Sequence, residues 1–137
     1  MNYLLDTNAC IALMNGAPVA VRSRFDKAIR AESRVYIPSV VAFELWYGIA
    51  KSARIEINTQ RLEALLSSSV FALPFDNEDA RVAGSIRADL QAVGRPIGGY
   101  DYLIAGQALA RQLTLVTANV SEFSRVKGLS WQDWAKP

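Results

Sequence analysis

The strongest constraint on the fold is the alternation of short apolar runs with helical patterns along the chain. Four runs have the length and composition of buried β-strands, at 3–5, 35–37, 70–73 and 114–116. Helices are predicted between them, at about 39–53 and 100–112 and around the apolar positions Ala83, Ile86, Leu90 and Val93. Strands that alternate with helices predict a three-layer α/β domain, with a mainly parallel central sheet flanked by helices.

Length and charge set further limits. The 137 residues suit one domain, so we expect residues 1–137 to form it. No run is long enough to cross a bilayer, and the start lacks a basic segment before its apolar stretch, so we expect a cytoplasmic protein without a membrane partner. Cys10 is expected to pack in the core. A net charge of +2 does not decide whether nucleic acid is a partner.

The chain contains no histidine, and this absence restricts its chemistry. Serine–histidine and cysteine–histidine nucleophiles are excluded, and the commonest zinc ligand is missing. Any hydrolytic reaction should therefore use carboxylates. At neutral pH, carboxylates favour hard cations such as Mg²⁺.

Four acidic residues are expected at one edge of the sheet. Asp6 ends the first strand, and Glu44 lies early in the helix after the second strand. Asp101 opens the helix that leads into the fourth strand, and Glu122 follows that strand. Strand ends and helix starts share the edge where α/β sheets bind ligands, so the four carboxylates should converge there. Their mutual repulsion should shift their pKa values until a divalent cation binds.

Each acid also has a purely structural interpretation. Asp6 suits a helix cap, and Asp101 suits the first turn of a helix, where its charge is favourable. Glu44 and Glu122 could face solvent, but Glu44 interrupts the apolar segment 40–47, where an unpaired carboxylate is costly. The neighbouring polar residues would either support the acids or form turns and caps: Thr7, Asn8, Thr117 and Asn119.

Positive charge for a phosphate backbone is available near these segments. The best candidates for phosphate contacts are Arg95, Arg125 and Lys127. A second basic set has the spacing of one helix face, which is more typical of a solvated surface: Lys27, Arg30 and Arg34. Trp131 and Trp134 could stack on bases, although aromatic residues near a C-terminus more often close the core.

Taken together, four segments resemble the successive motifs of PIN domains: Leu4–Asn8, Ser39–Gly48, Ile97–Ala105 and Leu115–Asn119 with Glu122 and Phe123. The stretch 123–129 resembles the ending typical of VapC toxins. Each motif is weak alone, but four occur in order over nearly the whole chain. The resemblance implies a PIN-like fold and a ribonuclease, usually the toxin of a bacterial toxin–antitoxin pair.

By position, the resemblance assigns the three acids found throughout the family to Asp6, Glu44 and Asp101, and the fourth acid of the toxin branch to Glu122. Asn119 stands where many other PIN domains carry an aspartate. The loop Gly98–Tyr100 departs from the proline-containing loop expected there. The resemblance further implies Mg²⁺, with Mn²⁺ as a substitute, an RNA substrate with tRNA favoured, homodimers, and a small VapB-type antitoxin.

The expected reaction is attack on phosphorus by a metal-activated water, which leaves a 5′-phosphate and a 3′-hydroxyl. Asp6 and Asp101 are the first choice as direct ligands, with Glu44 and Glu122 binding directly, binding through water, or orienting the nucleophile. Two alternatives stay open: a PIN-like DNA nuclease and a non-catalytic interaction domain. A haloacid-type phosphatase is disfavoured, because Asp6 is followed by Thr7 and Asn8 without an Asp-x-Asp pattern.

Overall fold

The computed structural model describes residues 1–136, and its centre is a parallel sheet. The strands lie in the order β3-β2-β1-β4-β5. Their bounds are β1 (Tyr3–Leu5), β2 (Val35–Pro38), β3 (Val70–Leu73), β4 (Thr114–Val116) and β5 (Trp131–Gln132). The four predicted strands are confirmed. β5 was not predicted, because two residues carry no periodicity and the strand exists only through its pairing with β4.

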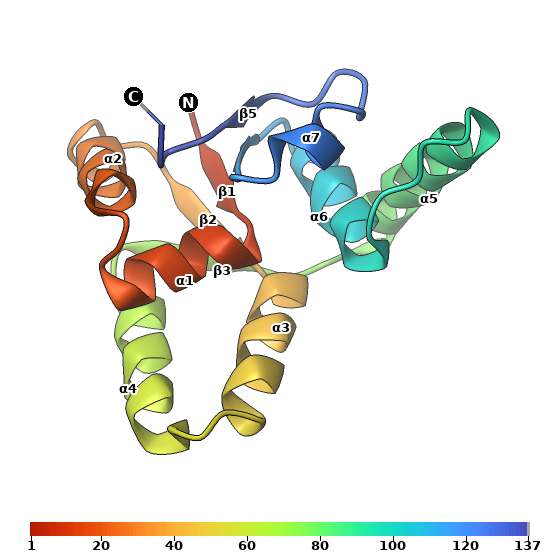
Figure 1. Cartoon of the computed structure of the whole chain (residues 1–137). Coiled ribbons are helices and arrows are strands. Elements are labelled where there is room, and N and C mark those ends of the chain that lie inside the picture. Colours follow the sequence, from red (N-terminus) through yellow and green to blue (C-terminus); the bar gives the residue numbers. More distant parts are fainter. Residues whose placement is uncertain (137) are drawn as a thin grey trace.

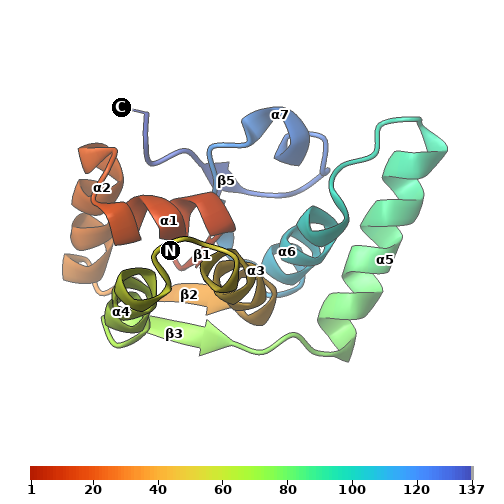
Figure 2. The same ribbon diagram turned by 60° about the horizontal axis from the view of Figure 1, so that its bottom comes forward.

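Helices cover both faces of this sheet, which confirms the three-layer prediction (Figure 1). Their bounds are α1 (Thr7–Asn15), α2 (Val19–Arg30), α3 (Ser39–Ala50), α4 (Ile55–Leu66), α5 (Asn77–Ala92), α6 (Gly99–Ala110) and α7 (Val120–Phe123). The chain steps outward from β1 to β3 and then returns across the sheet to β4 and β5. Right-handed crossovers therefore place α1 to α4 on one face and α5 to α7 on the other. In Figure 2, α5 and α6 lie side by side, and α6 also lies next to α3.

The central strands and the chain end close the core. Leu4, Leu5 and Leu115 on β1 and β4 are fully buried. Cys10 is buried as expected, and burial raises the pKa of its thiol, so it is an inert core residue. Trp134 is also buried and packs edge-on against Tyr3, with 5.1 Å between ring centroids. Trp134 therefore closes the core, as the commoner interpretation expects.

A polar cluster joins α5 to α6, the helix that carries Asp101. Asp79 is fully buried and accepts hydrogen bonds from Gln107 Nε2 at 3.0 Å and Arg111 Nε at 3.1 Å. Burial alone would raise the Asp79 pKa, but the hydrogen bonds of Arg111, the Asp76 backbone and Gln107 together hold it below its ordinary value. This cluster fixes the two helices together, and sequence patterns did not indicate it.

The prediction that Lys27, Arg30 and Arg34 share one helix face is wrong. α2 ends at Arg30, and Glu32 turns the chain with a positive φ of 61°. Arg34 consequently lies just before β2, with its guanidinium 5.2 Å from the centroid of the Phe71 ring. The helix after β2 ends at Ala50 rather than near residue 53. Within residues 1–136, no helix is long and apolar enough to span a membrane.

Candidate active site

The structure brings the four acids together at the carboxyl edge of the central strands. Asp6 directly follows β1, and Glu44 lies in the second turn of α3. Asp101 lies in the first turn of α6, and Glu122 lies on α7 after β4. The negative charges of the acids act on one another. The charge of Glu44 raises the Asp6 pKa, and the charges of Glu122, Glu44 and Asp6 raise the Asp101 pKa.

Asp6 is the most buried of the four acids, with 5% of its surface exposed. Its Oδ1 accepts a hydrogen bond from the Ala9 amide at 2.8 Å, so the capping interpretation is correct. Burial raises the pKa of Asp6, and hydrogen bonds from Thr117 and Ala9 offset part of that rise. The cap holds the carboxylate rigidly at the edge of the sheet.

Asp101 and Glu122 form a carboxyl pair. The Asp101 pKa is raised to about 7, first by burial, then by the hydrogen bond to Glu122 and the neighbouring negative charges. Glu122 has a lowered pKa, mainly because the Asn119 side-chain amide donates to its Oε2 at 2.8 Å. Asp101 therefore holds its proton to a higher pH than an ordinary aspartate does, next to the more acidic Glu122.

Three of the four expected supporting residues contact the acids. Thr7 Oγ1 donates to Glu44 Oε1 at 2.8 Å. Asn119 binds Glu122, and its backbone amide donates at 2.9 Å to Thr117 Oγ1, which in turn bonds Asp6. Asn8 is different: it is exposed and, within residues 1–136, makes no side-chain hydrogen bond to an acid.

Asp133 is a site neighbour that sequence reasoning missed. It directly follows β5, the fifth strand of the parallel sheet, and its charge raises the Asp6 pKa. Together with Asn8 and Thr117, it lines a pocket beside Asp6. An acid after a strand was the signal that found Asp6, but here the strand itself was too short to recognise.

The loop before α6, residues 93–98, lies against the Asp101 side chain. The Ile97 amide donates to the Tyr102 hydroxyl at 3.1 Å, and the Gly98 backbone bonds the Glu122 carboxylate. A Cβ at residue 98 would lie 3.0 Å from Asp101 Oδ2. A side chain at this position would press on the Asp101 carboxylate, so glycine permits this close approach without moving it.

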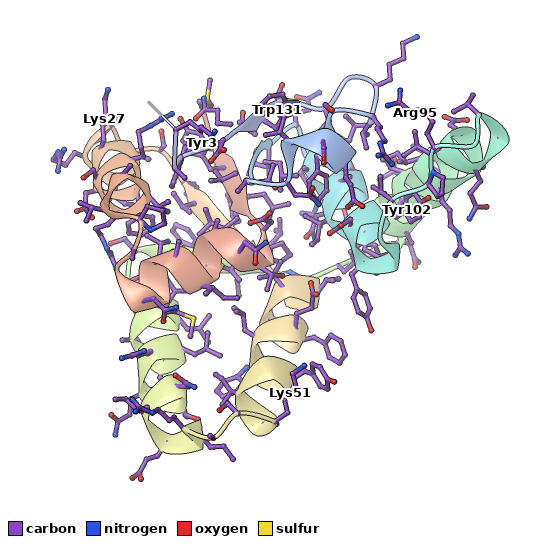
Figure 3. All side chains as sticks on the ribbon, viewed as in Figure 1. Tyr3, Lys27, Lys51, Arg95, Tyr102 and Trp131 are labelled. Atoms are coloured by element: carbon purple, nitrogen blue, oxygen red, sulfur yellow. The ribbon has the colours of Figure 1, made fainter. Side chains whose placement is uncertain are left out.

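The three basic candidates differ in their surroundings. Arg95 and Lys127 are exposed, and within residues 1–136 their side chains make no hydrogen bond or ion pair. Figure 3 shows Arg95 beside the C-terminal end of α5. Arg125 is half-buried, and its Nη1 donates to the Pro96 carbonyl at 2.7 Å. Arg95 and Lys127 thus remain open to a phosphate, whereas the Arg125 guanidinium is engaged by the protein.

An aromatic patch lies beside the acids and was not singled out from the sequence. It comprises Phe43, Trp46 and Tyr47 on α3 and Tyr100 on α6, each 43–58% exposed. Phe43 and Tyr100 contact edge to face, with ring centroids 5.7 Å apart. Large aromatic surfaces of this kind mark interaction sites, because water solvates them poorly.

The donor chemistry of the four acids suits a hard divalent cation, since all donors are oxygens. Among residues 1–136, however, no group of three or more His, Cys, Asp or Glu side chains is arranged so that it could hold an ion together. Mg²⁺ commonly keeps several waters and takes only one or two carboxylates. The acids therefore fit Mg²⁺ bound by one or two carboxylates and several waters, rather than enclosed in a cage of protein ligands.

Comparisons with known proteins agree with this geometry. The PIN domain family model matches residues 3–129. The chain is 40% identical to a tRNA(fMet)-specific endonuclease VapC of Shigella flexneri over 135 residues, covering 98% of this chain and 99% of that one. It is similar to the solved VapBC2 of Rickettsia felis bound to a promoter DNA fragment, with TM-score 0.91, 34% identity, and 98% and 99% of the two chains covered. The DNA-bound VapBC of Salmonella typhimurium matches with TM-score 0.89 and 38% identity, over 98% of each chain.

Proposed function

Because the chain belongs to the PIN-domain family and is similar to VapC ribonucleases, we propose that it is a metal-dependent endoribonuclease, the toxin of a toxin–antitoxin pair. The observation that carries this proposal is the convergence of Asp6, Glu44, Asp101 and Glu122 at one sheet edge, where their negative charges repel one another and raise the pKa values of Asp6 and Asp101. A divalent cation would relieve that repulsion, and a phosphate group would complete its ligands.

In this proposal, Asp6 and Asp101 provide the two direct carboxylate ligands for Mg²⁺, with Mn²⁺ as a substitute, and Glu44 binds the ion through water. The bound ion would make a water more acidic and offset charge that develops on the phosphate. The protein contributes orientation: the helix cap fixes Asp6, Thr7 directs Glu44, and Asn119 directs Glu122. Glu122 would orient the attacking water or bind the ion through water.

We propose tRNA(fMet) as the substrate. The support is that similar proteins from Shigella flexneri and Salmonella typhimurium, at 40% and 39% identity, are named tRNA(fMet)-specific endonucleases. Arg95 and Lys127 are exposed and close in sequence to the site segments, so they are the residues proposed to contact phosphates.

Purified protein, free of any antitoxin, should cleave tRNA(fMet) in Mg²⁺ but not in EDTA, and it should cleave a tRNA for another amino acid more slowly. Asp101→Asn should lower kcat/KM by at least about 100-fold, because a proposed metal ligand is lost. Asp26→Asn, the same change at a partly exposed position on α2 outside the cluster of acids, is the matched control. The fragments should carry 5′-phosphates.

Other outcomes of this experiment would contradict the proposal in different ways. Ends with 2′,3′-cyclic phosphate would exclude attack by water. Cleavage of DNA alone would favour the DNA-nuclease alternative. A folded protein that neither cleaves RNA nor binds Mg²⁺ or Mn²⁺ in calorimetry would favour a non-catalytic interaction domain.

For its partners, we propose a small VapB-type antitoxin and a homodimer. The antitoxin is supported by the solved VapBC complexes to which the chain is similar. A groove between α1, α3 and α4 fits an apolar peptide segment near Glu44, and it is lined by Ile11, Met14, Leu45, Ile49 and Asn58. The homodimer is supported by the aromatic patch on α3, which a second copy would shield from water.

A further inference from the structure

We infer that Arg125 is a positioning residue that keeps Glu122 against Asp101 by clamping α7 onto the loop before α6. The inference about the arrangement of the acids does not depend on the proposed function. Only the expected effect of Arg125 on RNA cleavage rests on that function. Arg125 lies three residues after Glu122, and its amide donates to the Glu122 carbonyl at 3.0 Å. Both residues therefore belong to one short turn of chain.

The Arg125 side chain is directed into the protein. Its Nη1 donates to the Pro96 carbonyl at 2.7 Å, across 29 positions of sequence. Its Nε is buried and, among residues 1–136, has no hydrogen-bond partner. A buried polar group without a partner is costly, and native proteins retain few of them. The Nη1 end of the guanidinium is thus bound to the loop in an exposed contact, and its Nε is buried.

Within residues 1–136, three side-chain contacts hold the loop, in addition to its backbone hydrogen bonds, and two of them come from the α7 segment. Arg125 binds the Pro96 carbonyl, and Glu122 accepts a hydrogen bond from the Gly98 backbone. The third contact comes from α6, where the Tyr102 hydroxyl accepts a hydrogen bond from the Ile97 amide. Figure 3 shows Tyr102 on α6, below the loop that begins near Arg95. The loop is therefore held from both helices that carry the acids.

α7 has four residues, too few to hold its own position by helix formation. Its place relative to α6 must come from tertiary contacts, and the Arg125 clamp is one that reaches the loop beside Asp101. Because Gly98 lies against Asp101 Oδ2, movement of the loop would separate Asp101 from Glu122. Arg125 thus acts on the acids through the loop, in addition to its positive charge, which after the larger effect of Asn119 also lowers the Glu122 pKa.

Kinetics distinguish this role from phosphate binding. Arg125→Ala should lower kcat about 10- to 100-fold, with KM and the salt dependence of kcat/KM little changed. Arg125→Lys should recover part of the loss, since an ammonium can reach the carbonyl. Arg87→Ala, on the exposed face of α5, removes the same charge as a control. If KM rises instead and the slope of log kcat/KM against log salt weakens by about 0.7–0.9, Arg125 is a phosphate contact and the clamp is wrong.

Amide hydrogen exchange tests the clamp without RNA. In Arg125→Ala, the Ile97 and Gly98 amides should exchange about tenfold faster than in wild type, with Arg125→Lys between the two and Arg87→Ala unchanged. If Arg125→Ala does not fold, Arg125→Lys carries the same measurement. Unaltered exchange in a folded variant would overturn the inference. A wild type that cleaves no RNA would contradict the proposed function alone, because the exchange result does not depend on cleavage.

Discussion

Asp101 lies in the first turn of a helix and also faces a second carboxylate. These two surroundings shift its pKa in opposite directions. The start of a helix favours the ionised form, whereas burial and the negative charges of Glu122, Glu44 and Asp6 favour the protonated form. The second effect is larger, because the pKa is raised to about 7. An ordinary aspartate ionises near pH 4, so between about pH 4 and 7 the folded protein binds this proton more tightly than the unfolded chain does. Its contribution to the free energy of unfolding therefore falls as pH rises through that window.

Asp101→Asn should remove this pH-dependent cost. Without divalent cations, we expect the variant to have a higher Tm than wild type at pH 8, and the difference should shrink toward pH 5. Mg²⁺ should raise the Tm of wild type at pH 8 and have little effect on the variant. Melting curves followed by circular dichroism measure both effects, with Asp26→Asn as a control of matched chemistry. A Tm difference that is independent of pH would show that the carboxyl is not perturbed.

At the scale of elements, the packing of α5 against α6 determines where Asp101 stands. Gly106 is buried in the middle of α6, and a Cβ there would come within 2.6 Å of the Ala83 Cα on α5. The two helices approach so closely that only glycine fits. Near the N-terminal end of α5, Asp79 binds Gln107 and Arg111 and fixes the relative position of the helices.

Two glycine substitutions test this packing. Gly106→Ala should reduce the free energy of unfolding by about 1–3 kcal/mol, because the added methyl group forces the helix backbones apart. Gly84→Ala, on α5 with nothing within 4 Å of its Cβ, should increase it by up to about 1 kcal/mol through better helix propensity. Urea denaturation gives both values. Similar effects of the two substitutions would mean that α5 and α6 can move apart at Gly106 without loss of stability.

At the scale of the whole molecule, the aromatic patch on α3 and α6 is the surface proposed to join two copies of the chain. Trp46→Glu places a charge in its centre and should convert a dimer into a monomer. Light scattering should give twice the chain mass of 15.0 kDa for wild type and the single mass for the variant. Ile57→Glu, at an exposed position on α4, should remain dimeric. A dimer that persists in Trp46→Glu would place the interface elsewhere.

The sequence by itself determined the three-layer parallel architecture and the candidate acids. Strand periodicity and helix periodicity are local properties, so β1 to β4 could be recognised from a few neighbouring residues. The parallel topology then followed, and it placed Asp6, Glu44, Asp101 and Glu122 at one edge. The absence of histidine by itself restricts hydrolytic chemistry in this chain to carboxylates.

Only the tertiary structure decided the features that depend on contacts between distant segments. β5 and Asp133 exist at the site because β4 offers an edge for pairing. The Asp101–Glu122 pair and the Arg125 contact with Pro96 join parts of the chain 21 and 29 positions apart, respectively. The sequence pattern placed Arg125 among the candidates for phosphate contacts, and it could not show the contact with Pro96, because a side chain's tertiary partner has no local signature. Proximity in space has no local signature in the sequence, and it governs burial, pKa and the direction of each side chain.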